Sequence, residues 1–212
     1  MYTEPFFREE RVDVLHEVMQ SIGLVSLISM GREGLDASHV PVVVNMEEGD
    51  KGTIHGHLFR GNDQWKKADV HIPVLVIFSG PETYVSPSWY ESKKKTPNVV
   101  PTWNYVAIHA YGKINFYDDR DRLLSMIAKL TDRHEQGRST PWSVTDAKEE
   151  YIEKLLKGVI GFEIPIERLD GKFKLSQNKN EADRLGVVQG LQADGVSSAL
   201  DVAEMMLETT RS

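Results

Sequence analysis

The sequence predicts a mainly β protein in which an antiparallel barrel carries helices on its outside. Six or seven segments have the composition or the alternation of strands, and several are joined by short, hairpin-like turns. Helical patterns gather towards the ends of the chain and do not alternate regularly with strands, as they would in a parallel sheet. The clearest alternation lies in Thr53–Phe59, where His55 and His57 share one face.

The composition indicates a soluble globular protein. The chain has 212 residues, of which 40% are hydrophobic and 27% charged. No apolar run approaches the ~18 residues of a membrane span, and the first ten residues lack the order of a secretory signal, so we expect a cytoplasmic location. The absence of cysteine excludes disulfides, thiolate nucleophiles and Fe–S clusters. A formal net charge of −7 argues against a surface that coats nucleic acid.

The first half of the chain predicts one helix and a series of strands. Apolar residues at helical spacing over 9–22 predict an amphipathic helix. Leu24–Met30 and Leu35–Asn45 flank a glycine-bounded turn and predict a hairpin. Val70–Phe78 is nearly all apolar, which predicts a central strand buried on both faces.

The second half predicts one long strand, two short strands and four helices. The apolar, β-branched run Thr102–Phe116 predicts the long strand. Ser143 and Asp146 have capping-box spacing, which predicts a helix from there to about Gly158. The other expected elements are a helix over Asp119–Arg133, strands over Val159–Ile166 and Leu169–Ser176, and helices over 180–193 and 197–209.

Two rigid aromatic corners precede the long strand. Ser86–Tyr90 and Val100–Tyr105 each contain a proline and a tryptophan, and proline fixes the angle at which a chain enters or leaves a sheet. Indole and phenol rings beside hydrogen-bonding side chains suit a planar heteroaromatic ligand or another subunit. For Trp89 or Trp103 taken singly, the alternative is a core residue under a loop.

The segment Arg60–Gln64 predicts an anion site. Asn62 can cap a short helix over Asp63–Ala68, so unpaired N–H groups, the helix dipole and the Arg60 guanidinium would converge. The alternative is a plain turn with an exposed arginine.

Histidines and lysines supply competing hypotheses. His55 and His57, with His39 and His109 on other strands, could hold a metal or a haem, although hydrogen-bonded structural histidines give the same pattern. No G-x-S-x-G motif marks a nucleophile elbow. DNA is a weakly supported partner, because the last two helices, which could mimic a helix-turn-helix, carry many acidic side chains that would repel phosphates.

Several strings together resemble the PaiB-type proteins. These are PSWY (87–90), PTWNY (101–105), HEQGR-x-x-PW (134–142) and GKFKLSQN (171–178). The start of the chain and the two histidine-bearing segments Leu35–Pro41 and His55–Leu58 fit as well. The resemblance runs in the same order from residue 1 to about 193.

The resemblance implies an FMN-binding split barrel, related in fold to pyridoxamine-phosphate oxidases and small flavin reductases. It also implies a homodimer with the flavin at the subunit interface. The family is commonly described as a negative transcriptional regulator. A flavin-dependent oxidoreductase or flavin reductase is the alternative function, and a metal- or haem-binding barrel is the third.

The resemblance also implies cofactor-binding residues. By strand order, the flavin phosphate falls beside His39, His57, Arg60, Asn62 and Gln64. The isoalloxazine ring falls beside Tyr84, Val85, Ser86 and Pro87, with Trp103, Asn104 and Tyr105 from the same or the partner subunit. A short basic strand that could approach the flavin or the dimer seam carries Lys172, Lys174 and Gln177.

A cation at the pyrimidine end of a flavin stabilises its reduced form, which is the role expected for those lysines. The alternative for them is one solvated face of an edge strand. The sequence assigns no catalytic residue and no metal. We predict a split-barrel domain over 1–178 and a helical extension over 179–212 that packs on the barrel or on the partner subunit.

Overall fold

The first hairpin forms as predicted. β2 (Leu24–Gly31) and β3 (Gly34–Asn45) pair antiparallel from Leu24↔Pro41 to Gly31↔Gly34. Gly34 has a φ of 107°, a conformation that glycine adopts without strain, so the chain reverses there.

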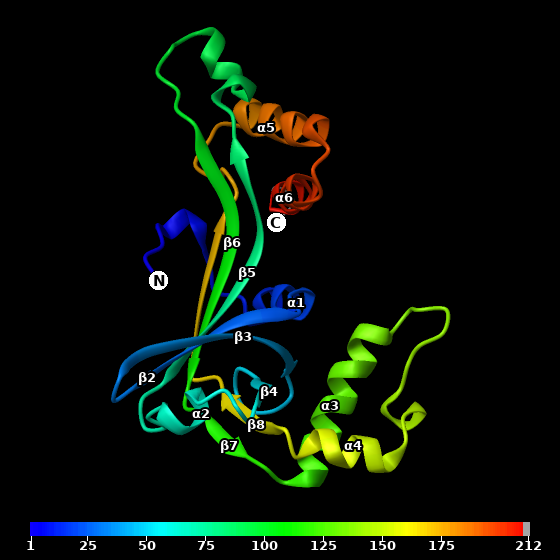
Figure 1. Ribbon diagram of the computed structural model, residues 1–212. Coiled ribbons are helices and arrows are strands. Elements are labelled where there is room, and N and C mark those ends of the chain that lie inside the picture. Colours follow the sequence, from blue (N-terminus) through cyan, green and yellow to red (C-terminus); the bar gives the residue numbers. More distant parts are fainter. Residues whose placement is uncertain (210–212) are drawn as a thin grey trace. The chain divides into compact units, whose positions relative to one another are not determined.

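The computed structural model describes residues 1–209 (Figure 1).

The chain divides into two compact units, which are described separately. Unit 1 comprises Met1–Arg11, Ser79–Ile108 and Asp170–Ser212, and unit 2 comprises Val12–Phe78 and His109–Leu169. Two long strands, β5 (Val74–Val85) and β6 (Thr102–Gly112), contribute residues to both units.

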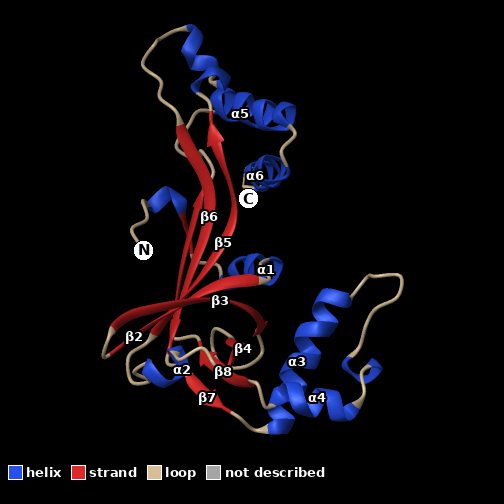
Figure 2. Ribbon diagram, viewed as in Figure 1, coloured by secondary structure: helices blue, strands red, loops and turns tan. Residues whose placement is uncertain are grey.

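Unit 2 contains the barrel strands around the hairpin. Their order is β5-β2-β3-β4-β8-β7, where β4 is Thr53–Phe59, β8 is Val159–Pro165 and β7 is Asn115–Tyr117. Alternate residues point inward and form an apolar core, for example Val25, Leu27, Val40, Val42, Ile54, Leu58, Ile160 and Ile164. Every pairing with a described register is antiparallel, and Figure 2 shows helices gathered outside these strands.

One glycine of β4 is required by the core. Gly56 pairs with Phe162 on β8, and a Cβ atom at Gly56 would lie 2.5 Å from Cζ of that ring. The fully buried phenylalanine therefore fills the space that a side chain at Gly56 would occupy.

Four helices belong to unit 2. They are α1 (Val12–Ser21), α2 (Gln64–Lys67), α3 (Arg120–Glu135) and α4 (Glu149–Leu156). Leu123 and Met126 of α3 pack with Leu156 of α4 in a small apolar cluster. The Arg133 guanidinium ties α3 to the barrel, because it donates to the carbonyl oxygen of Val42 at 2.9 Å and to that of Gln20. These contacts fix α3 over the outer face of β3.

Unit 1 contains the remaining strands and the last two helices. The strand order is β1-β9-β6-β5, where β1 is Arg8–Glu9 and β9 is Arg168–Lys174. The helices are α5 (Glu181–Asp194) and α6 (Ser197–Glu208), with short 3-10 turns at Pro5–Phe7, Pro87–Trp89 and Glu91–Lys94. Trp89 packs on α5, where a Cβ atom at Gly190 would lie 2.3 Å from its indole ring. Trp89 is half-buried, with its indole ring against α5.

The antiparallel barrel with outer helices is confirmed, and several boundaries differ from the prediction. The predicted strand Val70–Phe78 begins only at Val74, because Pro73 lacks an N–H and the chain before it turns, with His71 N donating to Asp69 Oδ1 at 2.9 Å. The predicted long strand stops at Gly112, and a separate β7 pairs Asn115 with Glu163 of β8.

Two helix starts also differ. The first helix begins at Val12 and not at residue 9, because Arg8 and Glu9 pair with β9 as strand β1. The Ser143–Asp146 capping box is present, but it caps a 3-10 turn over Val144–Asp146, and α4 starts at Glu149. The backbone of Ala147, with a ψ of 151°, separates the two. The predicted division after residue 178 stays a prediction.

Candidate functional site

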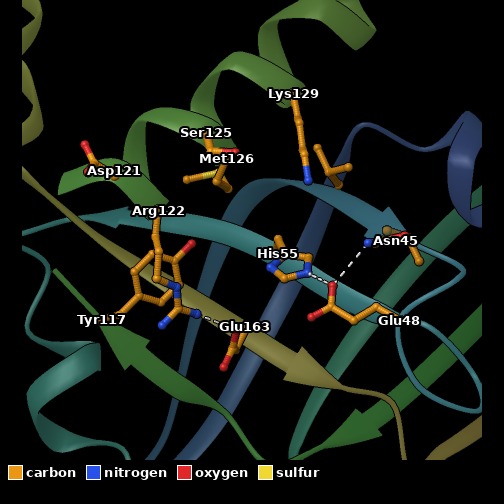
Figure 3. Close-up of a pocket in the computed structure, with 12 residues that line it drawn as sticks. Asn45, Glu48, His55, Tyr117, Asp121, Arg122, Ser125, Met126, Lys129 and Glu163 are labelled. Atoms are coloured by element: carbon orange, nitrogen blue, oxygen red, sulfur yellow. Dashed lines mark hydrogen bonds and ion pairs between the residues drawn. The ribbon is translucent and has the colours of Figure 1, made fainter. Parts of the chain in front are cut away.

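A cavity of about 590 Å³ lies in unit 2 between α3 and the outer face of β3, β4 and β8 (Figure 3). Its size lies within the ~300–1,000 Å³ range of small-molecule sites. The outer face consists of the residues that alternate with the core positions, so Val43 and His55, neighbours across β3 and β4, point into it.

Two pairs of side chains fix opposite walls of the cavity. Glu48 Oε2 lies 2.8 Å from His55 Nε2 and accepts from Asn45 Nδ2 at 3.2 Å. Arg122 Nη2 donates to Glu163 Oε2 at 2.6 Å, and its guanidinium lies 3.9 Å from the centre of the Tyr117 ring. Burial raises the pKa of Tyr117, so its phenol stays neutral at pH 7. The polar groups of these two pairs therefore already hold one another.

Lys129 is the cation of this cavity that these pairs leave unused. Across residues 1–209 its ammonium has no hydrogen bond or ion pair, and in Figure 3 the side chain extends from α3 towards the barrel strands. Ser125, one turn earlier on the same helix face, also lines the cavity with its hydroxyl unused in that part of the chain. Val43 and Met126 supply apolar surface. The cavity can therefore hold a molecule that has an anionic group and an apolar body.

His57 and His39 lie on the same outer face of the barrel. His57, two residues along β4 from His55, has a buried Nδ1 atom without a hydrogen-bond partner among residues 1–209. Burial lowers the pKa of His57, so the ring is neutral at pH 7 and offers one donor and one acceptor. His39 Nδ1 lies 3.1 Å from Ser26 Oγ. The atom does not line the cavity under α3, but a buried polar atom without a partner is a position where a ligand can supply one.

Arg60 supports the backbone at the start of β8. Its Nε and Nη2 atoms donate to the carbonyl oxygens of Lys157 at 3.1 Å and Val159 at 3.0 Å, and Nη1 lies 3.8 Å from Asp118 Oδ2. Arg60 lies at a turn with its side chain 36% exposed, and its guanidinium serves the backbone contacts of that turn. Contact between Arg60 and a phosphate stays a prediction.

Asn62 and Gln64 join α2 to the β2–β3 hairpin. Asn62 Nδ2 donates to Ser38 Oγ at 2.7 Å, and Asn62 Oδ1 accepts from Gln64 N at 3.0 Å. Asp63, and not Asn62, holds the N-cap position, and it makes no side-chain capping bond. Gln64 is 1% exposed, and its Nε2 lies within 3.2 Å of the Leu27 and Asp36 carbonyl oxygens and of Ser29 Oγ. These contacts are internal to the fold.

The outer face of the β2–β3 hairpin is apolar and uncovered within unit 2. Leu24 and Met30 on β2 and Leu35 on β3 are exposed, Leu35 by 73%. The register places Met30 opposite Leu35, and His39 with Ser26 lies between these apolar ends. Exposed apolar side chains gathered on one sheet face are typical of an interaction surface.

The residues predicted to face the isoalloxazine ring lie in unit 1. Tyr84 and Trp103 are exposed, Trp103 by 52%, and their rings meet edge to face at 6.3 Å. Val85 is buried, Ser86 caps the 3-10 turn by accepting from Ser88 N, and Pro87 begins that turn. Tyr84 and Trp103 therefore offer an aromatic surface, whereas Val85, Ser86 and Pro87 shape the chain beneath it.

The predicted lysines of β9 also lie in unit 1, and they are partly buried. Lys172 is 7% exposed, its Nζ lies 3.2 Å from Glu4 Oε2, and Tyr105 lies beneath it at 5.7 Å from the ring centre. Lys174 Nζ donates to Thr102 Oγ1 at 2.5 Å. The alternative of a solvated edge strand is wrong, because β9 lies between β1 and β6.

Asn104 and Gln177 complete the unit 1 set. Asn104 is buried and bonds Ser176, and the Gln177 amide donates to the Phe173 carbonyl oxygen at 2.6 Å. The structure thus divides the fifteen predicted contacts by unit: His39, His57, Arg60, Asn62 and Gln64 lie in unit 2 and the others in unit 1.

Sequence reasoning missed the cavity under α3. The signal was present, because Arg122, Ser125 and Lys129 follow at intervals of three and four residues and so share one face of the predicted helix. That spacing alone could not identify the strands opposite.

The metal hypothesis gains no support from the geometry. Within residues 1–209 no three histidine, aspartate or glutamate side chains converge as a metal site. No helix among those residues is long and apolar enough to cross a bilayer, and the expected cytoplasmic location stays a prediction.

Comparison with known proteins identifies relatives along nearly the whole chain. Residues 1–168 match the family described as "Putative FMN-binding domain". The protein named "Protease synthase and sporulation protein PAI 2" from Bacillus subtilis is 32% identical over 206 residues, covering 97% of this chain and 96% of that protein.

Two solved structures share the fold. The flavocytochrome Anf3 from Azotobacter vinelandii has a TM-score of 0.60 at 12% identity, covering 87% of this chain and 78% of its own. The FAD and heme binding protein from Mycobacterium smegmatis has a TM-score of 0.57 at 14% identity, covering 84% of this chain and 78% of its own. The predicted resemblance is confirmed, and the chain belongs to the PaiB-type family of FMN-binding split-barrel proteins.

Proposed function

We propose that this chain is a flavoprotein that binds FMN on the outer face of β3 and β4 and works as a homodimer. The observation that carries the proposal is the cavity of about 590 Å³ under α3, in a chain whose family model is an FMN-binding domain. The orphaned Nδ1 atom of His57 on the same face supports it.

The cavity is lined by three carboxylates, each of which already has a partner: Glu48 with His55, Glu163 with Arg122, and Asp121 with Arg120. The remaining lining residues fit FMN. A phosphate dianion needs a cation and hydroxyl or amide donors, which Lys129 and Ser125 provide without breaking an existing pair. The apolar edge of an isoalloxazine ring needs dry surface, which Val43 and Met126 provide. His57 would satisfy its free nitrogen against a polar atom of the flavin.

Bound FMN would supply hydride or single-electron transfer, so the protein needs no nucleophile of its own. The chain would bind and orient the cofactor and exclude water from it. Arg133 contributes indirectly, because its bonds to the Val42 and Gln20 carbonyl oxygens keep α3 above the cavity.

Lys129→Met should weaken FMN binding about tenfold or more, because a charge-assisted contact to phosphate contributes about 1.5–3 kcal/mol. Flavin fluorescence titration of the purified protein measures this. Lys154→Met on α4 is the matched control and should bind as the unchanged protein does.

Arg60→Met in the same titration decides between the two phosphate positions. If Arg60→Met loses affinity while Lys129→Met does not, the phosphate lies at the Arg60 turn and the cavity under α3 is not the site. If the unchanged protein shows no flavin binding, the proposed function is wrong.

The homodimer rests on the uncovered outer face of the β2–β3 hairpin. Leu24, Met30 and Leu35 are exposed apolar side chains on one antiparallel hairpin, and such a surface suits a two-fold contact between copies of the chain. The exposed Tyr84 and Trp103 of a second copy could then reach the flavin, as the sequence resemblance implies.

Leu35→Glu should raise the dimer dissociation constant about a hundredfold, because an unpaired carboxylate buried at the contact costs several kcal/mol. Light scattering after size-exclusion chromatography, over a concentration series, measures the mass. Leu155→Glu, at an exposed leucine on α4, should leave the dimer intact. A monomeric unchanged protein at micromolar concentration would contradict the homodimer.

A flavin-dependent oxidoreductase and a transcriptional regulator are both compatible with a flavin homodimer. The relative from Bacillus subtilis is named for protease synthesis and sporulation, which favours regulation. The acidic helices α5 and α6 disfavour direct DNA contact, because they carry Glu181, Asp183, Asp194, Asp201, Glu204 and Glu208. We favour the oxidoreductase. Oxidation of NAD(P)H by the FMN-loaded protein, without a shift of promoter DNA in a gel at physiological salt, is the expected result.

A further inference from the structure

A second cavity, of about 220 Å³, lies wholly within unit 1. It is enclosed by the N-terminal turn, the segment before β6 and the chain after β9. Phe6, Phe7 and Pro101 provide apolar walls, and Tyr90 and Lys179 provide polar groups. The proposed flavin site under α3 gives this cavity no role, although two of its lining residues, Asn104 and Lys174, belong to the set that the resemblance predicts for a flavin.

Tyr90 is the clearest sign of a missing partner. The residue is 3% exposed, and its buried hydroxyl has no hydrogen-bond partner among residues 1–209. Burial, and then the charge of Asp183, raise the pKa of Tyr90, so the phenol remains a protonated donor at neutral pH. A buried donor without an acceptor is destabilising, and native proteins rarely leave one unsatisfied.

The side chains that line the cavity carry a net charge of plus one. Lys174 and Lys179 line it together with a single carboxylate, Glu4, and Glu4 already faces Lys172 at 3.2 Å. Lys174 is occupied by the Thr102 hydroxyl and the Trp103 carbonyl oxygen. Lys179 has no hydrogen bond or ion pair from its ammonium in the described chain, and this ammonium lies 5.1 Å from the centre of the Tyr90 ring. One cation and one hydroxyl donor therefore remain for a ligand.

Ser176 and Asn104 form another part of the cavity wall, and they hold each other in place. Ser176 has a φ of 62°, a left-handed conformation that is unfavourable for a residue with a side chain. Its buried hydroxyl exchanges hydrogen bonds with the Asn104 side chain at 3.0 and 3.1 Å, which keeps this conformation in place. Strained residues that their surroundings hold in place cluster at binding sites.

We propose that the unit 1 cavity binds a small organic acid as its monoanion, with the carboxylate between the Tyr90 hydroxyl and the Lys179 ammonium and the apolar body against Phe6, Phe7 and Pro101. A carboxylate accepts from both donors and balances the single surplus charge. A dianion such as phosphate would exceed that charge and leave the apolar walls uncovered.

Calorimetric titration of the purified full-length protein with sodium benzoate tests the proposal. We expect saturable binding at one site per chain, and no binding of the neutral analogue benzamide. Tyr90→Phe and Lys179→Met should each weaken benzoate binding about tenfold. Inorganic phosphate should bind more weakly than benzoate.

Matched controls separate the site from general effects. Tyr151→Phe and Lys95→Met, both at exposed positions outside the cavity, should bind benzoate as the unchanged protein does. Tyr90→Phe should melt no lower than the unchanged protein, because it removes an unsatisfied hydroxyl, so a fall in affinity cannot be assigned to unfolding.

Three results would overturn the proposal: no benzoate binding, equal binding of benzamide, or unchanged affinity in both folded variants. FMN titration of the same two variants should give the affinity of the unchanged protein. If the proposed flavin site under α3 proved wrong, the benzoate test of the unit 1 cavity would therefore still be valid.

Discussion

Arg60→Met should lower the free energy of unfolding by about 2–3 kcal/mol, because two backbone carbonyl groups at the start of β8 lose a charged donor. The guanidinium donates to the Lys157 and Val159 carbonyl oxygens, and the Arg60 backbone N–H donates to the Gly158 carbonyl oxygen at 2.8 Å. Arg60 therefore connects the turn after β4 to the start of β8. The midpoint of thermal unfolding, followed by circular dichroism, should fall by about 4–10 °C.

Two further variants make this result specific. Arg60→Lys keeps the charge but cannot reach both carbonyl groups with a fixed fork, so it should recover only part of the loss. Arg138→Met changes an exposed arginine in the loop after α3 and should alter the free energy of unfolding by less than about 0.5 kcal/mol. An Arg60→Met protein as stable as the unchanged one, but unable to bind FMN, would show that the arginine serves the cofactor and not the fold.

Gln64→Leu should lower the free energy of unfolding by about 2–4 kcal/mol. The side chain is buried, and its amide nitrogen lies within hydrogen-bonding distance of Leu27 and Asp36 carbonyl oxygens and of Ser29 Oγ. Leucine has similar volume but no donor, so acceptors on both strands of the hairpin would be left buried and unsatisfied. The loss of unfolding free energy is limited because Gln64 Oε1 has no hydrogen-bond partner within residues 1–209 in the unchanged protein, so its removal breaks no hydrogen bond.

Urea unfolding by circular dichroism measures the effect of Gln64→Leu. Gln64→Asn retains the amide on a shorter side chain and should also destabilise, because the amide cannot span from α2 to both strands. Gln136→Leu, at an exposed position, should leave the midpoint unchanged. A Gln64→Leu protein that unfolds at the same urea concentration as the control would contradict a role for this amide in closing the hairpin end.

Much of the fold followed from local pattern. The β2–β3 hairpin was predictable because Gly31 and Gly34 bound a short turn between two apolar runs. Period-2 alternation placed His55 and His57 on one face of β4, and the Ser143–Asp146 capping box forms as its spacing indicates. The local pattern gave a wrong prediction where a strand distant in sequence offered a partner. The segment Asn115–Tyr117 was predicted to continue the long strand, but it forms the separate strand β7 and pairs with β8.

The candidate site was less predictable, because most of its contacts join residues far apart in the chain. Helical spacing could align Arg122, Ser125 and Lys129. Arg122, however, pairs with Glu163, 41 residues later, whereas Lys129 has no ion pair within residues 1–209. The sequence alone determined the family, the barrel elements and a set of candidate side chains for a flavin. Only the tertiary structure decided which of those side chains remain free. Strand register brings acceptors to some donor side chains, as it brings the Val159 carbonyl oxygen to Arg60 across 99 residues. Other donors, such as Lys129 and the Tyr90 hydroxyl, have no hydrogen-bond partner within residues 1–209.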